Sequence, residues 1–266
     1  MFDRFGREIT YLRISVTDRC NLRCTYCMPE DGVEFRPHNQ ILSYESITRI
    51  VRAGAELGIR KVRLTGGEPL VRRNLPALVA QIAGIPGIEH VAMTTNGSLL
   101  PRYAGPLRAA GLSSVNISLD TLDPERFREI TRRGQLEDTL AGIDAARKAG
   151  FSPIKLNMVV APETTEAEIE RMGVFCAEKG MELQLIAHYR LDIRKHDHHR
   201  FNRPPNCACC NRLRLTAEGA LKPCLHSNIE IPVDFDDPAA SILEAVRAKP
   251  VAGTVCTNRS MMSIGG

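Results

Sequence analysis

Six short apolar runs alternate with longer amphipathic segments between residues 11 and 188, and this alternation strongly limits the folds open to the chain. The runs have the length and composition of strands, at residues 11–16, 61–65, 90–94, 115–119, 155–160 and 182–188. The intervening segments have helical spacing, at residues 44–57, 75–82, 104–110, from 124 onward, 136–148 and 166–179. Strands that alternate with helices form mostly parallel sheets with right-handed crossovers. Six units are too few for an eight-stranded barrel, so we expect an α/β fold, a partial (βα)6 TIM-like barrel open on one side.

Residues suited to helix ends support these boundaries. Ser43 and Asn74 stand where N-caps are needed, and Asp123 precedes Pro124 in the order expected of a cap and a first helical residue. Gly58 follows the first predicted helix, where a glycine commonly ends one.

Two cysteine triads lie near the two ends of the chain. Cys20, Cys24 and Cys27 follow the first predicted strand in a C-x3-C-x2-C pattern. A second triad has the pattern C-x2-C-x13-C and consists of Cys207, Cys210 and Cys224. Three thiolates on a [4Fe–4S] cluster leave one of its four irons open to a small molecule. Two such triads predict two open clusters that hold non-protein ligands near each other, which is typical of an enzyme.

Other interpretations of the cysteines stay open at this point. Cys207 and Cys210 alone have the spacing of half a zinc knuckle, so a zinc-binding regulatory module without catalysis is an alternative. Cys209 is either a bystander or a fourth ligand that would close the second cluster. Cys176, on an amphipathic segment, and Cys256 are interpreted as a core thiol and a tail thiol.

Composition limits the cellular compartment and the kinds of binding partner that we expect. The chain has no apolar run of 18 residues, and its first residues show no secretory signal. Nine cysteines, six of them at cluster spacing, favour a reducing cytoplasm over a disulfide scaffold. A net charge of +4 allows an anionic small substrate. With no Trp and few other aromatic residues, we expect neither nucleic-acid binding nor a membrane span.

The chain changes character after Tyr189. The segment 190–206 is charged, rich in His and contains Pro, which is typical of a loop. We therefore expect two parts, a core barrel over residues 1–190 and a small C-terminal [4Fe–4S] module over residues 191–266. His196, His198 and His199 belong to this loop and are interpreted as solvated side chains.

Several motifs together resemble one enzyme family. They are residues 11–29 (YLRISVTDRCNLRCTYCMP), residues 61–70 (KVRLTGGEPL), residues 94–97 (TTNG), residues 210–216 (CNRLRLT) and the pair Gly265-Gly266. The C-x3-C-x2-C loop and Gly66-Gly67-Glu68-Pro69 resemble the radical S-adenosylmethionine (SAM) superfamily. The finer matches resemble its GTP 3′,8-cyclase family, which acts first in molybdenum cofactor biosynthesis.

The resemblance implies two [4Fe–4S] clusters with SAM bound to the first one. The SAM-derived 5′-deoxyadenosyl radical would abstract the ribose C3′ hydrogen of GTP, and the sugar radical would attack C8 of guanine. Glycines without a Cβ would let backbone approach the methionine moiety closely. The residues assigned to SAM are Tyr26, Gly66, Gly67, Glu68, Ser118 and Tyr189.

The resemblance also assigns a cationic substrate site. The planar fork of arginine suits phosphate oxygens, and several cations are needed to neutralise a triphosphate. The residues assigned to GTP are Arg13, Arg63, Thr94, Lys155, Arg212 and Arg214. The open iron of the second cluster would hold the guanine base. The reductant would be a protein such as flavodoxin or ferredoxin. The oligomeric state stays open, and a homodimer is one alternative.

Some positions depart from the family pattern. The family usually has Met at Tyr189, Arg at Gln184 and Glu at Ala187, and some tens more residues before the second triad. A shortened paralogue with the same SAM chemistry on another substrate, such as a peptide, is therefore the alternative function.

Overall fold

The computed structural model describes residues 1–194, 201 and 206–265, and its strands form one nine-stranded sheet in the order β6-β5-β4-β3-β2-β1-β7-β8-β9. Strands β1 to β6 pair in parallel, and β7 is parallel to β1. Strand β8 pairs antiparallel with both β7 and β9. The strands are β1 Tyr11–Ser15, β2 Lys61–Thr65, β3 His90–Thr95, β4 Ser114–Ser118, β5 Ile154–Val160, β6 Glu182–Ala187, β7 Arg212–Leu215, β8 Ala220–Lys222 and β9 Ile231–Pro232.

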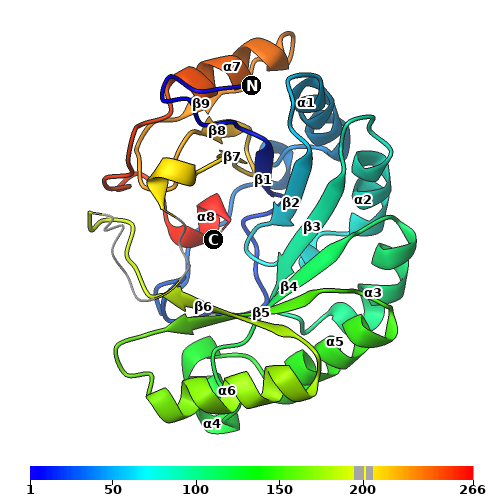
Figure 1. Cartoon of the computed structure of the whole chain (residues 1–266), viewed down its shortest axis with the longest axis vertical. Coiled ribbons are helices and arrows are strands. Elements are labelled where there is room, and N and C mark those ends of the chain that lie inside the picture. Colours follow the sequence, from blue (N-terminus) through cyan, green and yellow to red (C-terminus); the bar gives the residue numbers. More distant parts are fainter. Residues whose placement is uncertain (195–200, 202–205, 266) are drawn as a thin grey trace.

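Helices cover the outer side of the arc that β1 to β6 form (Figure 1). Because β6 and β9 are the two edges of the described sheet and do not pair, the barrel stays open, and the predicted partial barrel is confirmed. The α-helices are α1 Tyr44–Glu56, α2 Leu75–Ala83, α3 Leu100–Ala109, α4 Pro124–Thr131, α5 Leu136–Lys148, α6 Glu166–Glu178, α7 Pro238–Arg247 and α8 Met261–Ile264. Short 3-10 turns occur at η1 His38–Gln40, η2 Pro69–Val71 and η3 Cys207–Cys209.

The predicted caps are confirmed at two of three helices. The side chain of Ser43 accepts a hydrogen bond from the amide of Ser46, and Asp123 accepts from Glu125 and Arg126. The cap predicted at Asn74 is wrong, because this residue adopts a left-handed conformation with φ of 56° and its side chain makes no cap bond.

Alternation along the strands separates the core from the interior of the barrel. Leu12 and Ile14 of β1 are buried in the apolar core, as are Val62 and Leu64 of β2. Tyr11 and Arg13, which alternate with them on β1, line the internal cavity. One face of each strand therefore builds the core, and the other face carries polar side chains into the barrel.

The sheet extends past the predicted core barrel. Strand β7 pairs parallel with β1 and places Arg212 beside Tyr11 and Arg214 beside Arg13. The predicted hairpin after β7 is confirmed, with Gly219 at a φ of +98° between β7 and β8. The division of the chain at residue 190 stays a prediction, and the hydrogen-bonded sheet runs across it.

Within the described ranges, every helix is too short or too polar to cross a lipid bilayer. All nine cysteines lie in these ranges and none forms a disulfide. Cys176 is a core thiol as predicted, with 1% of its surface exposed.

Candidate active site

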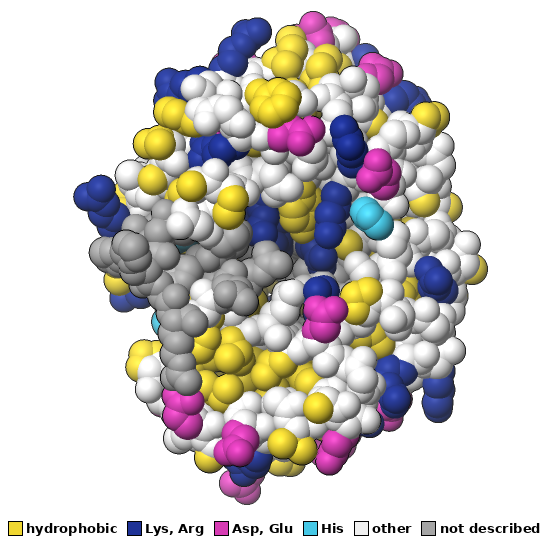
Figure 2. All heavy atoms as spheres, in the orientation of Figure 1, with side chains coloured by type: hydrophobic (Ala, Val, Ile, Leu, Met, Phe, Trp, Pro, Cys, Tyr) yellow, Lys and Arg dark blue, Asp and Glu magenta, His cyan; other side chains and the backbone are white. Residues whose placement is uncertain are grey.

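A cavity of about 530 Å³ occupies the interior of the open barrel. Figure 2 shows the hollow at the centre of the molecule, where Lys and Arg side chains lie beside hydrophobic ones. The thiols of both triads line this cavity, as do five of the six residues assigned to GTP and all six assigned to SAM. The exception is Lys155, which does not line the cavity and forms an ion pair with Glu182 on the neighbouring strand.

The two triads lie toward opposite ends of the strands. Cys20, Cys24 and Cys27 follow the carboxyl end of β1, whereas Cys207 and Cys210 precede the amino end of β7. Because β1 and β7 are parallel, the cavity runs between the two triads.

The first triad is held in a compact turn. The amides of Cys27 and Met28 both donate to the carbonyl of Cys24, at 3.0 Å each. Burial raises the pKa of Cys24 to about 12, and the charges of Asp120 and Cys20 act in the same direction. Burial and the two neighbouring thiols also raise the pKa of Cys27. Three thiolates this close need compensating positive charge, which the irons of a cluster supply, so the donor set fits an iron–sulfur cluster.

The two glycines of the GGEP motif pack against the cluster loop. A Cβ on Gly67 would lie 2.3 Å from the carbonyl oxygen of Arg19, and one on Gly66 would lie 2.6 Å from that of Thr17. The amide of Gly67 donates to Thr17 at 2.9 Å. Close contact between the two loops, and not only with a ligand, therefore requires glycine at both positions.

Glu68 joins the motif to the next strand. Its carboxylate accepts from the amides of Leu70 and Asn96 at 3.0 and 2.7 Å and from the Thr95 hydroxyl at 2.8 Å. Burial raises its pKa to about 7, against the lowering effect of these donors. Glu68 therefore fixes the loop that the resemblance assigns to the methionine moiety.

Tyr26 is oriented by a residue that the sequence motifs did not identify. Its hydroxyl donates to Asp120 at 2.7 Å, and Asp120 also accepts from the amide of Val159 at 2.8 Å. The ring of Tyr189, which also lines the cavity, lies near that of His226 with 5.2 Å between centroids. Ser118 lies at the end of β4 and lines the same cavity.

The arginines of the cavity differ in how many protein acceptors they bind. Arg63 donates to the Tyr11 hydroxyl at 2.7 Å, to the Met93 carbonyl at 3.0 Å, to Thr94 at 3.2 Å and to Asn116 at 2.9 Å. These four bonds commit Arg63 to the protein and place Thr94 against it.

Arg212 has fewer contacts. Its guanidinium lies 5.5 Å from the ring centroid of Tyr11, and its buried Nε has no hydrogen-bond partner within the described ranges. A buried donor without an acceptor is costly, so this nitrogen is suited to an anionic ligand.

Arg13, Arg212 and Arg214 form a cationic wall of the cavity, and the carbonyl of Gly265 contacts two of these arginines. It accepts from Arg13 and Arg214 at 3.2 Å each and from the Thr65 hydroxyl at 3.0 Å. Gly265 has a φ of +75°, and a Cβ there would lie 2.1 Å from the Thr65 hydroxyl. Only glycine fits this position. Gly266 lies outside the described residues.

The second triad is braced by residues distant in sequence. The amide of Gly253 lies 3.4 Å from the Cys207 sulfur, and the ammonium of Lys249 lies 3.5 Å from the Cys210 sulfur. Burial alone would raise the pKa of Cys210, but Lys249 and Arg212 together outweigh it and lower that pKa. Donors directed at the sulfurs stabilise thiolates, which fits the donor set of a second cluster.

Arg7 fixes the loops around this triad. It donates to the carbonyls of Cys207, Pro250 and Val251 at 2.8, 2.6 and 3.0 Å and is itself paired with Asp3 at 2.7 Å. No spacing motif marks Arg7 or Lys249, so neither could be identified from the sequence.

Cys209 lies apart from the other thiols. It is exposed and does not line the cavity, and its Sγ lies 3.4 Å from the carbonyl of Asn206. His196, His198 and His199 lie outside the described residues.

In the described part of the chain, no three His, Cys, Asp or Glu side chains converge on a point that could hold a single metal ion. A cubane cluster does not need such convergence, because each thiolate binds a different iron at a corner of the cluster.

Comparison with known proteins first defines the class. The chain belongs to the radical SAM superfamily, since residues 14–176 match the family described as Radical SAM superfamily. Two solved structures of similar fold are native anSMEcpe with bound AdoMet and Streptococcus suis SuiB bound to S-adenosylmethionine. The first has a TM-score of 0.68 at 14% identity and covers 91% of this chain and 81% of its own. The second has a TM-score of 0.67 at 16% identity and covers 86% and 64%.

The more similar relatives define the family. A GTP 3′,8-cyclase of Petrotoga mobilis is 38% identical over 323 aligned positions that cover all of both chains. A GTP 3′,8-cyclase of Heliobacterium modesticaldum is 41% identical and covers 94% of this chain and 93% of its own. Within the superfamily, the chain therefore belongs to the GTP 3′,8-cyclase family. Since this chain has 266 residues, the Petrotoga protein contains residues with no counterpart here.

Proposed function

We propose that this protein converts GTP to (8S)-3′,8-cyclo-7,8-dihydroguanosine 5′-triphosphate in molybdenum cofactor biosynthesis, as a radical SAM lyase. The observation that carries the proposal is that one cavity is lined by two cysteine triads and by Arg13, Arg212 and Arg214. Few reactions need an open cluster at each end of a site and a cationic wall between them.

The residues of the first triad and the loops around them bind and orient SAM. Cys20, Cys24 and Cys27 hold the first cluster, and Gly66 and Gly67 shape the loop beside it. With SAM bound, this cluster supplies a 5′-deoxyadenosyl radical that removes the C3′ hydrogen of the substrate ribose. The protein must keep water away from this chemistry, and the apolar part of the cavity wall, which includes Leu22, Met28, Val159 and Ile186, serves that purpose.

The cationic wall binds the triphosphate. Arg212 and Arg214 on β7 lie beside Tyr11 and Arg13 on β1, so their charges act on the same part of the cavity. Charged hydrogen bonds from guanidinium to phosphate are strong and directional. Cys207, Cys210 and Cys224 would hold the second cluster, whose fourth iron position is left for the guanine base.

Turnover requires electrons from outside the chain. SAM cleavage needs one electron, and closing the ring to an isomer of GTP needs a second electron and one proton. A low-potential carrier such as flavodoxin or ferredoxin in the reducing cytoplasm would supply them. A homodimer stays a prediction, which light scattering of the anaerobic protein would test.

Anaerobic incubation of the reconstituted protein with SAM, reductant and GTP tests the proposal. We expect 5′-deoxyadenosine together with a new species that has the mass of GTP but separates from it by chromatography. SAM cleavage without any change in GTP would contradict the proposal and favour the paralogue that acts on another substrate.

A further inference from the structure

The segment of residues 256–265 enters the cavity and ends at its cationic wall. Figure 1 shows α8 inside the arc of strands, and Met261, Met262 and Gly265 line the cavity. The Gly265 carbonyl accepts from both Arg13 and Arg214, whose like charges repel each other. The position of this segment therefore affects the geometry of the cations proposed to bind phosphate.

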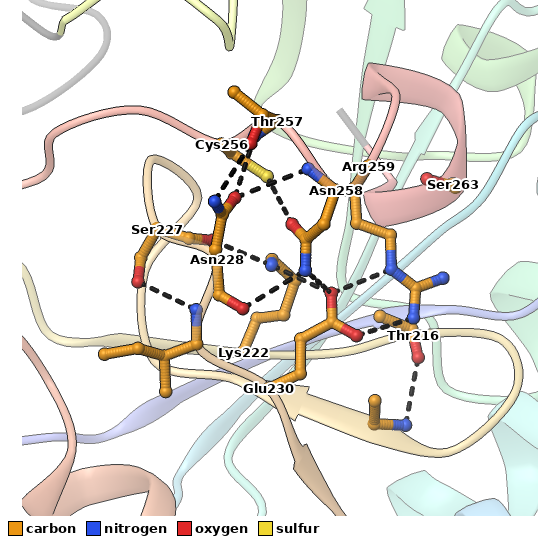
Figure 3. Close-up of polar contacts among 12 residues, drawn as sticks. Thr216, Lys222, Ser227, Asn228, Glu230, Cys256, Thr257, Asn258, Arg259 and Ser263 are labelled. Carbon is orange, nitrogen blue, oxygen red and sulfur yellow. Dashed lines mark hydrogen bonds and ion pairs between the residues drawn. The ribbon is translucent and has the colours of Figure 1, made fainter.

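Arg259 anchors this segment with all three of its guanidinium nitrogens. Its Nε and Nη2 donate to the two oxygens of Glu230 at 2.8 and 2.7 Å, and its Nη1 donates to Glu218. Figure 3 shows the paired bonds between Arg259 and Glu230. The Arg259 side chain is 13% exposed and the two Glu side chains are 16% and 19% exposed, so water screens these pairs only partly.

Charges of alternating sign extend from Arg259 into the protein. Glu230 also accepts from Lys222 at 3.0 Å, and the fully buried Lys222 ammonium donates to the Ser227 carbonyl at 2.9 Å. Although burial would raise the pKa of Glu230, the contacts with Arg259 and Lys222 outweigh burial and lower it. The carboxylate is therefore held charged where it receives Arg259.

A second set of bonds attaches the same segment beside Arg259. The side-chain oxygen of Asn228 accepts from the amide of Thr257 at 2.8 Å, and its nitrogen donates to the Thr257 hydroxyl at 2.9 Å. The side chain of Asn258 donates to the Asn228 carbonyl at 3.1 Å. Figure 3 shows these contacts next to the ion pairs.

The residues that hold Arg259 belong to the part of the chain around the second cysteine triad. The acceptors Glu218 and Glu230, and Lys222 that donates to Glu230, lie in or beside β7 to β9. The same stretch contains Arg212 and Arg214 on β7 and Cys224 after β8. Arg259 therefore joins the 256–265 segment to the stretch of chain that carries Arg212 and Arg214, the cations proposed to bind GTP, and Cys224, a proposed cluster ligand.

We propose that Arg259 is a positioning residue, which holds the 256–265 segment on Glu218 and Glu230 so that the Gly265 carbonyl aligns Arg13 and Arg214 for the polyphosphate. This inference rests on the proposed function for the identity of the anion. Arg259 lies in the segment before α8 and acts on the ligand only through Gly265 and the two arginines.

The test compares reconstituted Arg259→Gln and Arg259→Lys proteins with the parent. Arg126→Gln is the matched control, since Arg126 on α4 forms an ion pair with Glu168 on α6 at 2.8 Å. Hydrogen–deuterium exchange of residues 256–265 is measured without ligand, and dissociation constants are measured for GTP and for SAM.

In Arg259→Gln we expect about tenfold faster exchange of this segment and about tenfold weaker GTP binding, with SAM binding unchanged. The exchange rate and the GTP affinity of Arg259→Lys should lie between those of Arg259→Gln and the parent, because an ammonium cannot form the paired bonds to Glu230. Arg126→Gln should match the parent in all three measurements. A general loss of stability would instead weaken GTP and SAM binding together.

Parent-like exchange in Arg259→Gln, or fast exchange with parent-like GTP binding, would overturn the proposal. If Arg259→Gln does not fold, Arg259→Lys and Glu218→Gln allow the same comparison. A parent that does not bind GTP would contradict the proposed function, while the exchange data would still decide whether Arg259 anchors the segment.

Discussion

At the scale of single residues, Tyr11 has several cationic side chains around it. Its hydroxyl accepts from Arg63, and Lys61 and Arg212 lie near its ring, at 5.4 and 5.5 Å from its centroid. Burial alone would raise the pKa of Tyr11, but Arg13, Arg63 and Arg212 outweigh burial and lower it to about 8. The phenol therefore ionises in the pH range in which enzymes are assayed.

This ionisation predicts a pH dependence of GTP binding. A phenolate offsets part of the cationic charge, so GTP affinity should fall as the pH rises through about 8, where Tyr11 of the free protein loses its proton. Tyr11→Phe keeps the ring but cannot ionise, and the fall should disappear. Calorimetric titration with GTP at several pH values measures this. An identical pH profile in parent and variant would show that Tyr11 does not titrate beside the ligand.

At the scale of secondary-structure elements, β7 places Arg212 and Arg214, two of the arginines proposed to bind phosphate, in the cavity. The motif around Arg212 and Arg214 could be recognised in the sequence, and so could the hairpin that follows it. The pairing of β7 with β1 could not, because a four-residue strand carries little periodicity and its partner lies about 200 residues away. The six strands of the barrel were predictable because each one repeats the same local pattern.

The position of β7 predicts the effect of Arg212→Ala. Loss of a charged hydrogen bond should weaken GTP binding by about 1.5–3 kcal/mol, with SAM binding unchanged. Arg60→Ala is a suitable control, since Arg60 is exposed beside Glu8 at 3.9 Å. Equal GTP affinity in Arg212→Ala and the parent would mean that β7 does not contact the triphosphate.

The turn η3 and the residue after it carry three cysteines, which differ in exposure. Cys207 and Cys210 line the cavity and Cys209 is exposed, which supports the interpretation of Cys209 as a bystander. Cys209→Ala should therefore retain about eight irons per chain, the content of two cubanes, and bind GTP normally. Cys207→Ala is the matched variant and should lose the second cluster. Loss of iron in Cys209→Ala, seen by iron analysis and EPR spectroscopy, would assign Cys209 as a ligand.

At the scale of the whole molecule, the two ends of the chain meet at the second triad. Arg7 reaches the carbonyl of Cys207, and Lys249 donates to the carbonyls of Arg212 and Pro223 at 2.7 Å each. Residues of this kind cannot be found from spacing, since they are defined only by contacts across the fold. The cysteine ligand sets were easier to predict, because cluster chemistry demands a residue type and a local spacing.

The sequence assigns Lys155 to the site, but the structure places it away from the cavity. The family resemblance assigns it to GTP, yet its ammonium pairs with Glu182 away from the cavity. Its role in substrate binding stays a prediction, because the pair is partly exposed and exposed pairs are weak enough for a ligand to displace.

If the cavity brings the SAM-derived radical to C3′ of GTP, deuterium at that carbon should be transferred to 5′-deoxyadenosine. The reconstituted protein is incubated anaerobically with SAM, reductant and GTP deuterated at C3′, and 5′-deoxyadenosine is analysed by mass spectrometry. We predict that 5′-deoxyadenosine gains one deuterium, and that Cys24→Ala forms none of this product. Unlabelled 5′-deoxyadenosine, at the same rate with or without GTP, would contradict the account.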